Sequence, residues 1–243
     1  MPATPAWPPE SAPRLFVETP LSDGAEIRID GGQAHYLISV MRLKPGAPVK
    51  LFDDATGEWL AEVAHLGKRD LIVRIDGRLR EREAVPDLWL LAAPIKKGRI
   101  DWVAEKACEL GVARFRPVLT RRTVIDRVNL ERLRAHMTEA AEQCGRTALP
   151  ALDDTVRLDA LLGRWPADRT LYFADEEGGE AFAPSPGPAA ILIGPEGGFD
   201  ADERAAIRAL PQARAITLGP RILRAETAAL AAISVWMRTA GDW

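Results

Sequence analysis

The sequence has few of the residues that cross-link a chain or hold a metal ion. Its 243 residues include 2 cysteines, Cys108 and Cys144, and 3 histidines, His35, His65 and His136. Neither set has the spacing of metal ligands, so we expect no bound metal. Two scattered cysteines are typical of a reducing compartment, where we expect buried thiols without a chemical role rather than a disulfide.

Long apolar runs are also missing. No run approaches the roughly 18 residues of a membrane-spanning helix, so we expect no membrane segment. The stretch from Met1 to Pro9 has neither a basic region nor an apolar core, and it indicates a flexible tail over residues 1–13 rather than a secretory signal. We therefore expect a cytoplasmic protein. The composition, 47% hydrophobic and 28% charged, is ordinary for a globular chain of one large domain or two small ones.

Familiar nucleotide-binding and nucleophile motifs are absent as well. A P-loop needs a lysine and a serine or threonine after its second glycine, and the glycine-rich stretch 194–199 has neither. The dinucleotide fingerprint has another glycine spacing and belongs near the start of a βαβ unit, whereas this stretch lies late in the chain. No serine elbow occurs. The sequence therefore offers no standard cradle for phosphate.

What the first third of the chain does contain is β structure. Short, partly alternating apolar runs are separated by turns rich in glycine and proline, which is typical of a small barrel or sandwich. The predicted strands are 14–17, 26–29, 48–52, 59–63 and 71–75. Helical spacing predicts one helix over 33–43, with His35 and Arg42 at its ends. The charged stretch 78–86 is interpreted as a linker or an edge.

From residue 88 onward strands and helices alternate, which predicts an α/β fold with a parallel sheet. Asn129 is the expected N-cap of the longest helix. We place the boundary between two domains at residue 76, with a first domain over 1–76 and a second over 77–243. The predicted strands of the second domain are 88–93, 114–119, 170–174, 189–193 and 215–218, and its predicted helices are 98–110, 129–144, 157–163, 200–210 and 226–238.

Two late turns carry most of the functional information. Gly194-Pro195 and Gly219-Pro220 each follow a predicted strand, and a helix comes after each. Glycine lets backbone groups approach a ligand closely, and proline fixes the turn. Because open α/β sheets bind ligands at the carboxyl ends of their strands, the turns predict one small-molecule pocket built mostly from backbone. Its expected ionic side chains are Glu196, Arg221, Arg224 and Glu226.

The charged residues indicate which classes of ligand the chain can bind. A pocket with a glutamate on its wall and no phosphate cradle suits a neutral or cationic molecule, and S-adenosylmethionine, with its sulfonium and ammonium groups, is compatible. Residues 76–150 carry 15 basic and 11 acidic side chains, and arginine predominates. Arginine pairs with phosphate and stacks on bases, so this excess permits nucleic-acid binding. The alternative is a solvated helix face.

Five blocks then stand in order along residues 14–238: His35 to Arg42, Lys96 to Val112, Glu139 to Arg146, Gly194 to Phe199 and Leu218 to Ala228. Together they resemble the RsmE-type 16S ribosomal RNA uracil-N3 methyltransferases of the SPOUT superfamily. The last two blocks look like the family's signature loops. Lys97-Gly98 departs from the Gly-Asp that the family more often has, which leaves the conformation of that turn open.

This resemblance implies a PUA-like β-barrel that helps to bind RNA, followed by a SPOUT-type parallel sheet with a C-terminal trefoil knot. It also implies a homodimer that uses S-adenosylmethionine to methylate N3 of a uridine in 16S ribosomal RNA of the small ribosomal subunit. The cofactor-binding residues carried over are Leu192, Ile193, Gly194, Glu196, Gly197, Gly198, Leu218, Gly219, Ile222, Leu223 and Ala228.

Transfer to N3 of uracil requires loss of its proton and stabilisation of the anion that forms. Arg224 is predicted to stabilise that anion, with Arg221 as the second choice. Glu226 and Glu196 are the two candidates for the base. The alternatives are that Glu226 only favours the start of the last helix and that Glu196 holds the loop or the ligand.

Basic residues in or near the matching blocks are predicted to bind the RNA, through contacts that are largely to phosphate. For Arg146 the alternative is a salt bridge in the dimer, and for His35 it is capping or packing. Two rival functions stay open: a ribose 2′-O-methyltransferase of the same superfamily and a non-catalytic RNA-binding assembly factor. The predicted RNA-binding residues are Arg14, His35, Arg42, Lys44, Lys96, Arg99, Arg121, Arg122 and Arg146.

Overall fold

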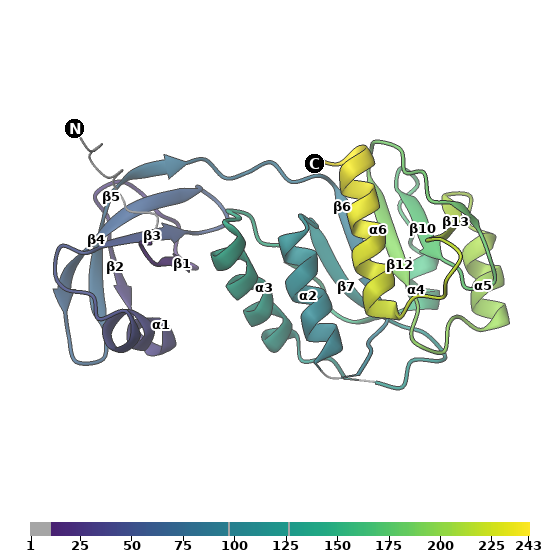
Figure 1. Ribbon diagram of the computed structural model, residues 1–243, viewed down its shortest axis with the longest axis horizontal. Helices are drawn as coiled ribbons and strands as arrows, with labels where there is room; N and C mark the ends of the chain where they lie inside the picture. The colour runs from purple at the N-terminus through teal and green to yellow at the C-terminus, as the bar shows by residue number, and fades with distance from the viewer. Residues whose placement is uncertain (1–10, 97, 126) are drawn as a thin grey trace. The chain divides into compact units, whose positions relative to one another are not determined.

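The computed structural model describes residues 11–96, 98–125 and 127–243. Within them the chain forms two compact units. Unit 1 ends at Ala84 and also takes in Ala141–Ala148, whereas unit 2 comprises Val85–Ala140 and Leu149–Trp243. Residues 1–10 of the expected tail and Lys97, beside the Gly98 turn, lie outside the described residues. Figure 1 follows the chain through its helices and strands.

Unit 1 is built on a five-stranded sheet with the strand order β1-β3-β4-β5-β2. β1 and β3 pair in parallel, and the other three described pairs are antiparallel. Alternate side chains such as Val49 and Leu51 are fully buried and form the core, as expected of strands with one covered face. The strands are β1 (Arg14–Phe16), β2 (Glu26–Ile29), β3 (Pro48–Phe52), β4 (Glu58–Leu66) and β5 (Leu71–Arg80).

The end of β5 corrects one expectation. The sequence assigns residues from 78 onward to a linker or an edge, but the strand continues to Arg80 and pairs with the start of β4. Gly57 makes this close approach possible, because a Cβ atom there would lie 2.2 Å from the carbonyl oxygen of Arg80. The charged side chains of this stretch point to solvent or form ion pairs, so they do not interrupt the strand.

The helix predicted over 33–43 is shorter and starts earlier. An α-helix, α1, spans Gly31–His35, and the chain then widens into a π-helix, η1, over Tyr36–Val40. Arg42 has a φ of 53°, a left-handed conformation that ends the helix. Arg42 and Lys44 therefore lie beyond the helix.

Two carboxylates are held inside unit 1. Asp53 is 7% exposed and accepts hydrogen bonds from three backbone N–H groups and the Thr56 hydroxyl. Glu58 pairs with Arg14 and Arg80. Burial opposes the charge of each carboxylate, but these partners outweigh it and hold the pKa of both groups below their ordinary values.

Glu58→Gln is expected to destabilise unit 1 at neutral pH and to flatten its response to acid. A depressed pKa means that the carboxylate contributes stability above its ordinary value of 4.5 and loses it as the pH falls through the lower folded value. The measurement is the urea midpoint between neutral pH and about pH 3, a span that covers the ordinary range for a glutamate. Glu26→Gln, at an exposed position on β2, is the control, and an unchanged acid response in Glu58→Gln would contradict the assignment.

Unit 2 has an eight-stranded sheet in which every described pair is parallel. This confirms the predicted parallel α/β fold. The strand order is β11-β13-β10-β12-β6-β7-β8, with β9 paired to β7. The strands are β6 (Leu88–Ala92), β7 (Arg114–Leu119), β8 (Ala151–Leu152), β9 (Val156–Arg157), β10 (Thr170–Ala174), β11 (Glu180–Ala181), β12 (Ala189–Ile193) and β13 (Ala213–Thr217).

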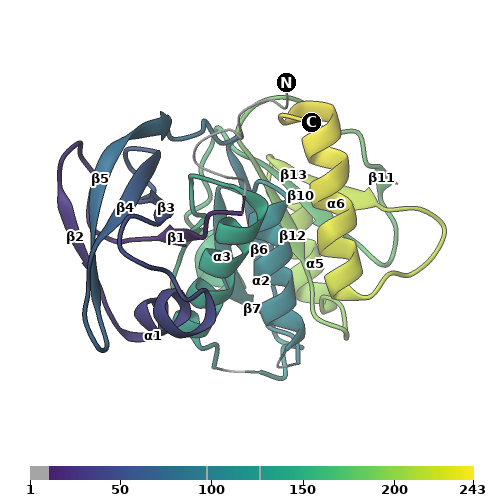
Figure 2. The same cartoon turned by 60° about the vertical axis from the view of Figure 1, so that its left-hand side comes forward.

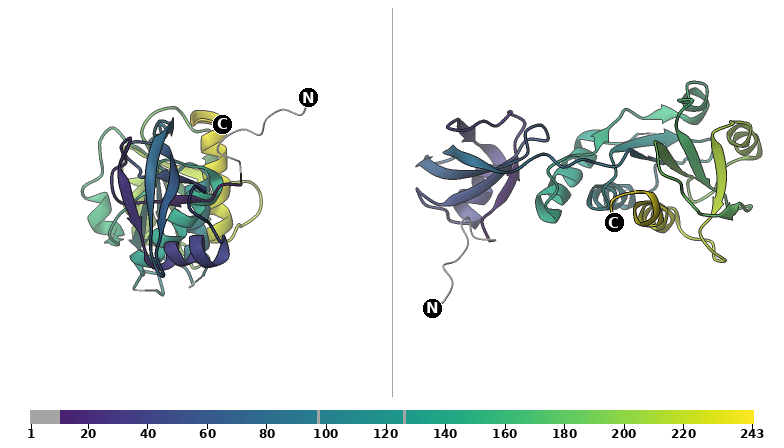
Figure 3. Two further views of the ribbon diagram at one scale, coloured as in Figure 1. Left: turned by 90° about the vertical axis from the view of Figure 1, so that its left-hand side faces the viewer. Right: turned by 90° about the horizontal axis from the view of Figure 1, so that it is seen from above.

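Helices cover both faces of this sheet. α2 (Arg99–Glu109) and α6 (Ala225–Ala240) pack side by side on one face, and α4 (Leu158–Leu162) and α5 (Ala201–Arg208) lie on the other (Figure 3). All five side chains of β12 are buried, as a central strand between two helical layers requires. The remaining helix, α3, spans Leu130–Cys144.

Side chains cap two of these helices. The backbone N–H of Arg132 donates to Asn129 Oδ1 at 2.9 Å, which confirms the predicted N-cap of α3. Asp200 caps α5 by accepting from the N–H of Glu203 at 2.8 Å. In the described part of the chain, no helix has the length and apolar character that crossing a membrane would require.

Strand order decides where the functional turns meet. β10 lies between β12 and β13, and the three strands run parallel (Figure 2). Their carboxyl ends therefore share one edge of the sheet, although they end at residues 174, 193 and 217. The predicted meeting of the two glycine-proline turns follows from this order, and a third segment, the one after β10, joins them. The knot stays a prediction.

Candidate active site

A cavity of about 520 Å³ opens at this edge of the sheet. Three loops and the first turns of α6 surround it, all within unit 2. Volumes of about 300–1,000 Å³ are usual for small-molecule sites. The lining residues are Ala174, Asp175, Glu176 and Gly178 from the end of β10 onward, Ile193 to Gly198 from the end of β12 onward, and Ile216 to Ala225 with Ala228 from the end of β13 into α6.

In the loop after β12, Gly194 and Gly198 lie where a Cβ atom would meet neighbouring side chains. A Cβ atom on Gly194 would lie 3.1 Å from the buried ring of Phe199. Gly198 has a φ of 68° and donates its N–H to Pro195 O at 2.9 Å, which closes the turn. A Cβ atom on Gly198 would lie 2.0 Å from Glu176 Oε1. The glycines therefore let the carboxylate and the turn approach each other.

The loop after β13 completes the wall. Gly219 has a φ of 109°, and its carbonyl accepts from the Thr217 hydroxyl at 3.2 Å. Ile222 is 81% exposed, which is high for an isoleucine beside a cavity. Arg224 is the N-cap of α6 and has extended backbone, so the chain turns into the helix at the cavity itself.

Nearly all residues predicted to bind the cofactor line this cavity. Leu192 is the exception: it is fully buried within β12 and packs in the core of unit 2. Its side chain points between the layers because every position of this central strand is covered. The lining residues among those predicted are Ile193, Gly194, Glu196, Gly197, Gly198, Leu218, Gly219, Ile222, Leu223 and Ala228.

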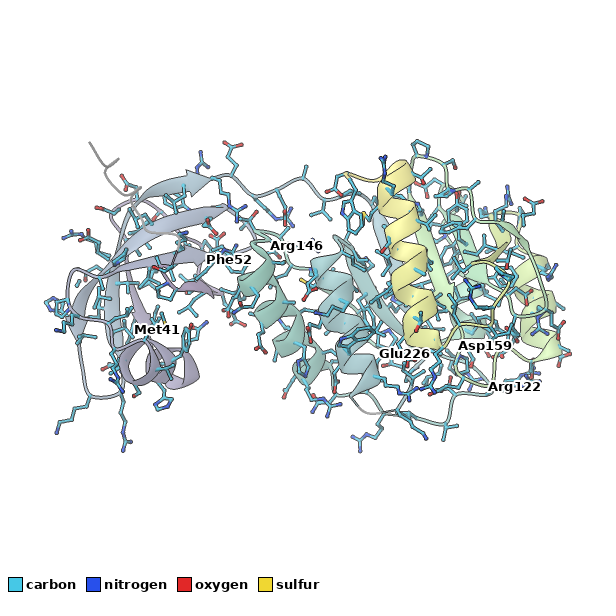
Figure 4. The ribbon with its side chains drawn as sticks, in the orientation of Figure 1. Met41, Phe52, Arg122, Arg146, Asp159 and Glu226 are labelled. Carbon is cyan, nitrogen blue, oxygen red and sulfur yellow. The ribbon has the colours of Figure 1, made fainter. Side chains whose placement is uncertain are left out.

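The predicted ionic side chains divide into two groups. Glu196, Arg221 and Arg224 line the cavity and are exposed. Glu226 does not line it: Oε1 lies 3.1 Å from Arg99 Nη1, and Oε2 is buried without a hydrogen-bond partner among the described residues (Figure 4). The expectation that Glu226 belongs to the ionic lining is therefore corrected, because the first turn of α6 directs its side chain to α2.

Sequence reasoning missed the acidic segment after β10. Asp175 has no exposed side-chain surface and accepts from Arg204 Nε at 3.0 Å and Arg208 Nη2 at 2.7 Å. Arg204 also pairs with Glu176 and Glu177. Burial disfavours the charge on Arg204, but the three carboxylates outweigh it and raise its pKa. The signal was an acidic run directly after a predicted strand, at the edge where the two turns also end.

The arginines after β7 contact the loop that follows β12 and the start of α5. Arg122 Nη1 donates to Gly197 O at 2.7 Å. Arg121 Nη1 lies 2.8 Å from Asp200 and 2.7 Å from Asp202. The N–H of Glu203 and the Arg121 guanidinium hold the pKa of Asp200 below its ordinary value. Both arginines remain exposed, so these contacts leave part of each guanidinium open to solvent.

The other predicted RNA-binding residues differ in their surroundings. Arg14 is largely buried, pairs with Glu58 and donates to the carbonyls of Ala141 and Arg146. Arg146 Nε donates to Glu83 Oε1 at 3.2 Å, and its side chain is 7% exposed. These placements favour a structural role for both within unit 1. By contrast, the exposed members of the set are His35, Arg42, Lys44 and Lys96.

Unit 1 has a depression of its own, of about 820 Å³, beside α1. His35 lines it together with basic residues that sequence reasoning did not select. Arg28 pairs with Asp70 at 2.8 Å, whereas Lys68 and Arg69 are exposed. The basic lining residues are Arg28, His35, Lys68 and Arg69, and the acidic ones are Asp30 and Asp70.

Comparison with known proteins gives a consistent result. Residues 81–237 match the model of an RNA methyltransferase domain, and residues 29–76 match that of an RNA methyltransferase PUA domain. The ribosomal RNA small subunit methyltransferase E of Rickettsia conorii is 31% identical over 91% of this chain and 93% of its own. That of Bacillus subtilis is 28% identical over 91% and 94%. The Neisseria gonorrhoeae enzyme of the same name, crystallised with S-adenosyl methionine, has a TM-score of 0.86, 27% identity and coverage of 96% and 99%.

Proposed function

We propose that this protein, which belongs to the ribosomal RNA small subunit methyltransferase E family, transfers a methyl group from S-adenosylmethionine to N3 of a uridine in 16S ribosomal RNA. The observation that carries this proposal is the cavity at the shared edge of β10, β12 and β13, lined by the residues that the family resemblance selects. We propose further that unit 1 binds RNA, that unit 2 holds the cofactor and that the protein works in the cytoplasm.

The lining of the cavity fits S-adenosylmethionine. Its volume of about 520 Å³ is in the range of small-molecule sites. Backbone around Gly194 and Gly219 can accept from and donate to an adenine edge, because glycine has no side chain of its own. Glu196 provides negative charge near a cationic molecule. When bound, the cofactor supplies an electrophilic methyl group on its sulfonium.

Arg224 is assigned to the developing anion. N3 of uracil is a weakly acidic imide, and loss of its proton spreads negative charge onto O2 and O4. A guanidinium carried by the N-cap residue of α6, on the cavity wall, can stabilise that charge. Arg221 lines the same wall and is assigned to substrate placement.

Of the two candidates for the base, Glu196 is favoured by position. It is exposed and lines the cavity, so a bound uracil can reach its carboxylate. Glu226 is turned toward Arg99 on α2. We assign the Arg99–Glu226 pair to holding the first turn of α6, and therefore Arg224, in place.

Product analysis tests this function. Purified 16S RNA and assembled small subunits are incubated with the protein and labelled S-adenosylmethionine, and the product is mapped by primer extension and mass spectrometry. A methyl group on a uracil base that stops primer extension is the expected result. A product that resists alkaline hydrolysis would instead identify a ribose 2′-O-methyltransferase. RNA binding without any methyl transfer would identify an assembly factor.

Replacing Lys68 and Arg69 together by alanine is expected to weaken RNA binding about tenfold and to reduce the slope of log K against log salt by about 1.4 to 1.8, because two phosphate contacts are lost. Both side chains are exposed beside the depression of unit 1. Affinity is measured by filter binding at several salt concentrations. The control is Arg74→Ala, on exposed β5 surface outside the depression. An unchanged salt slope would remove this surface from the RNA interface.

We also propose that two copies associate. Among its described residues, unit 2 exposes five large apolar side chains: Trp102 of α2, Val124, Ile222 of the cavity loop, Val235 of α6 and Trp243. The family resemblance implies a homodimer, so we expect a second copy of the chain to cover part of this exposed apolar surface. The molar mass measured by sedimentation equilibrium tests this association. A monomer at micromolar concentration would refute it.

A further inference from the structure

Glu176 is a carboxylate of the cavity that the proposed reaction does not yet use. It belongs to the loop after β10 and lines the cavity beside Gly198. Its side chain is 34% exposed, so it is only partly covered by its neighbours. Its closeness to the Gly198 turn places it at the wall where backbone can hold the adenosine part of a ligand.

The Glu176 side chain is held in place by Arg204. Arg204 Nη2 donates to Glu176 Oε1 at 2.5 Å. Arg204 is itself fixed, because its Nε donates to buried Asp175 and it also donates to the carbonyl of Phe199 at 3.2 Å. A carboxylate held in this way keeps its position when a ligand arrives, which lowers the entropic cost of binding.

The second oxygen of the carboxylate is open to a donor. Oε1 is taken by Arg204, no partner of Oε2 is found among the described residues, and Glu176 as a whole is exposed. An accessible carboxylate oxygen beside a backbone turn is suited to accept from N–H or O–H groups. S-adenosylmethionine has two kinds of such donor, the ribose hydroxyls and the ammonium group.

The positive charge of Arg204 favours one of these two kinds of donor over the other. Arg204 neutralises much of the charge on Glu176, and its guanidinium would repel an ammonium group placed at the same oxygens. A neutral hydroxyl has no such penalty. A carboxylate that accepts from ribose hydroxyls is also a known device for holding adenosine at the carboxyl edge of a parallel sheet.

We propose that Glu176, held by Arg204, is a specificity-determining residue that accepts a hydrogen bond from a ribose hydroxyl of the methyl donor. This inference rests on the proposed function, since it takes S-adenosylmethionine as the ligand of the cavity. It adds a recognition role to a segment that neither glycine-proline turn contains. It also explains why Gly198 has no side chain, because a Cβ atom there would displace the carboxylate.

The test is a ligand series measured by calorimetry without RNA. 5′-Methylthioadenosine keeps the ribose and lacks the amino-acid end, and its 2′-deoxy and 3′-deoxy forms each remove one hydroxyl. In the wild-type protein, loss of the recognised hydroxyl is expected to weaken binding about tenfold or more, as for a hydrogen bond to a charged group. In Glu176→Ala the same loss is expected to change the affinity less than about twofold, because its partner is gone.

Glu177→Ala is the matched control. Glu177 also pairs with Arg204, at 2.8 Å, but it is 66% exposed and does not line the cavity. It should keep the wild-type dependence on the hydroxyl, and circular dichroism verifies that both variants fold.

Two results would overturn the role of Glu176. One is an unchanged hydroxyl dependence in Glu176→Ala, and the other is weaker binding of S-adenosylmethionine with no change for 5′-methylthioadenosine, which would assign the carboxylate to the ammonium group. Wild-type protein that binds neither ligand would overturn the proposed function itself.

Discussion

Arg224→Ala is expected to lower kcat for methyl transfer by about 10²- to 10³-fold, the usual cost of losing one fixed donor to a transition-state anion. The Kd for S-adenosylmethionine should change little, because the cofactor is expected to be held mainly by the backbone of the two glycine-proline turns. Arg224 lines the cavity as the N-cap of α6, so the start of the helix sets the position of its backbone at the cavity wall. Single-turnover rates and calorimetry measure the two quantities separately.

Two further variants sharpen this test. Arg224→Lys keeps the positive charge but not the planar fork, so a partial recovery of kcat is expected. Arg238→Ala, an exposed position at the other end of α6, is the matched control and should behave as the wild type. A nearly normal kcat in Arg224→Ala, with a raised KM for RNA, would reassign this arginine to a phosphate contact and leave Arg221 as the candidate.

Gly198→Ala is expected to weaken binding of S-adenosylmethionine about tenfold or more, which corresponds to about 1.4 kcal/mol. Two causes combine. The φ of 68° is unfavourable for alanine, and the new Cβ would lie 2.0 Å from Glu176 Oε1. Glu176 can swing away, since it is the far end of a flexible side chain, so the fold should survive. That movement breaks the contact with Arg204 and opens the cavity wall.

The two causes can be separated by a control at another glycine. Gly24 has a φ of 74° and no atom within 4 Å of a Cβ placed on it. Gly24→Ala should therefore show only the cost of the left-handed backbone, which lowers the free energy of unfolding by about 1 kcal/mol. Its binding of the cofactor should be normal. If Gly198→Ala binds S-adenosylmethionine as the wild type does, the turn does not form the binding wall.

Much of the candidate site was predictable because it depends on local patterns. The strand before Gly194-Pro195 is a continuous apolar run, and a strand of five buried residues such as β12 is expected to be central in a covered sheet. Once the sheet is parallel, the ends of its strands share an edge, so turns that are far apart in sequence meet. The glycines then indicate that backbone faces the ligand.

The partners of charged side chains could not be predicted in this way. Arg14 and Arg146 have the same local pattern as exposed arginines, yet the fold directs them to carbonyl and carboxylate groups inside unit 1. Glu226 is turned to Arg99, and Arg122 contacts Gly197. Each of these contacts joins residues more than 60 positions apart, and periodicity reports only which face of an element is covered.

The sequence by itself determined the class of fold, most element positions and the two turns that enclose the cavity, because backbone conformation and burial follow from nearby residues. Tertiary structure alone decided which charges face the cavity and which are neutralised. It placed the segment after β10 between the two turns and so added Glu176 to the site. Strand order and long-range packing set those distances, and neither is encoded in a local pattern.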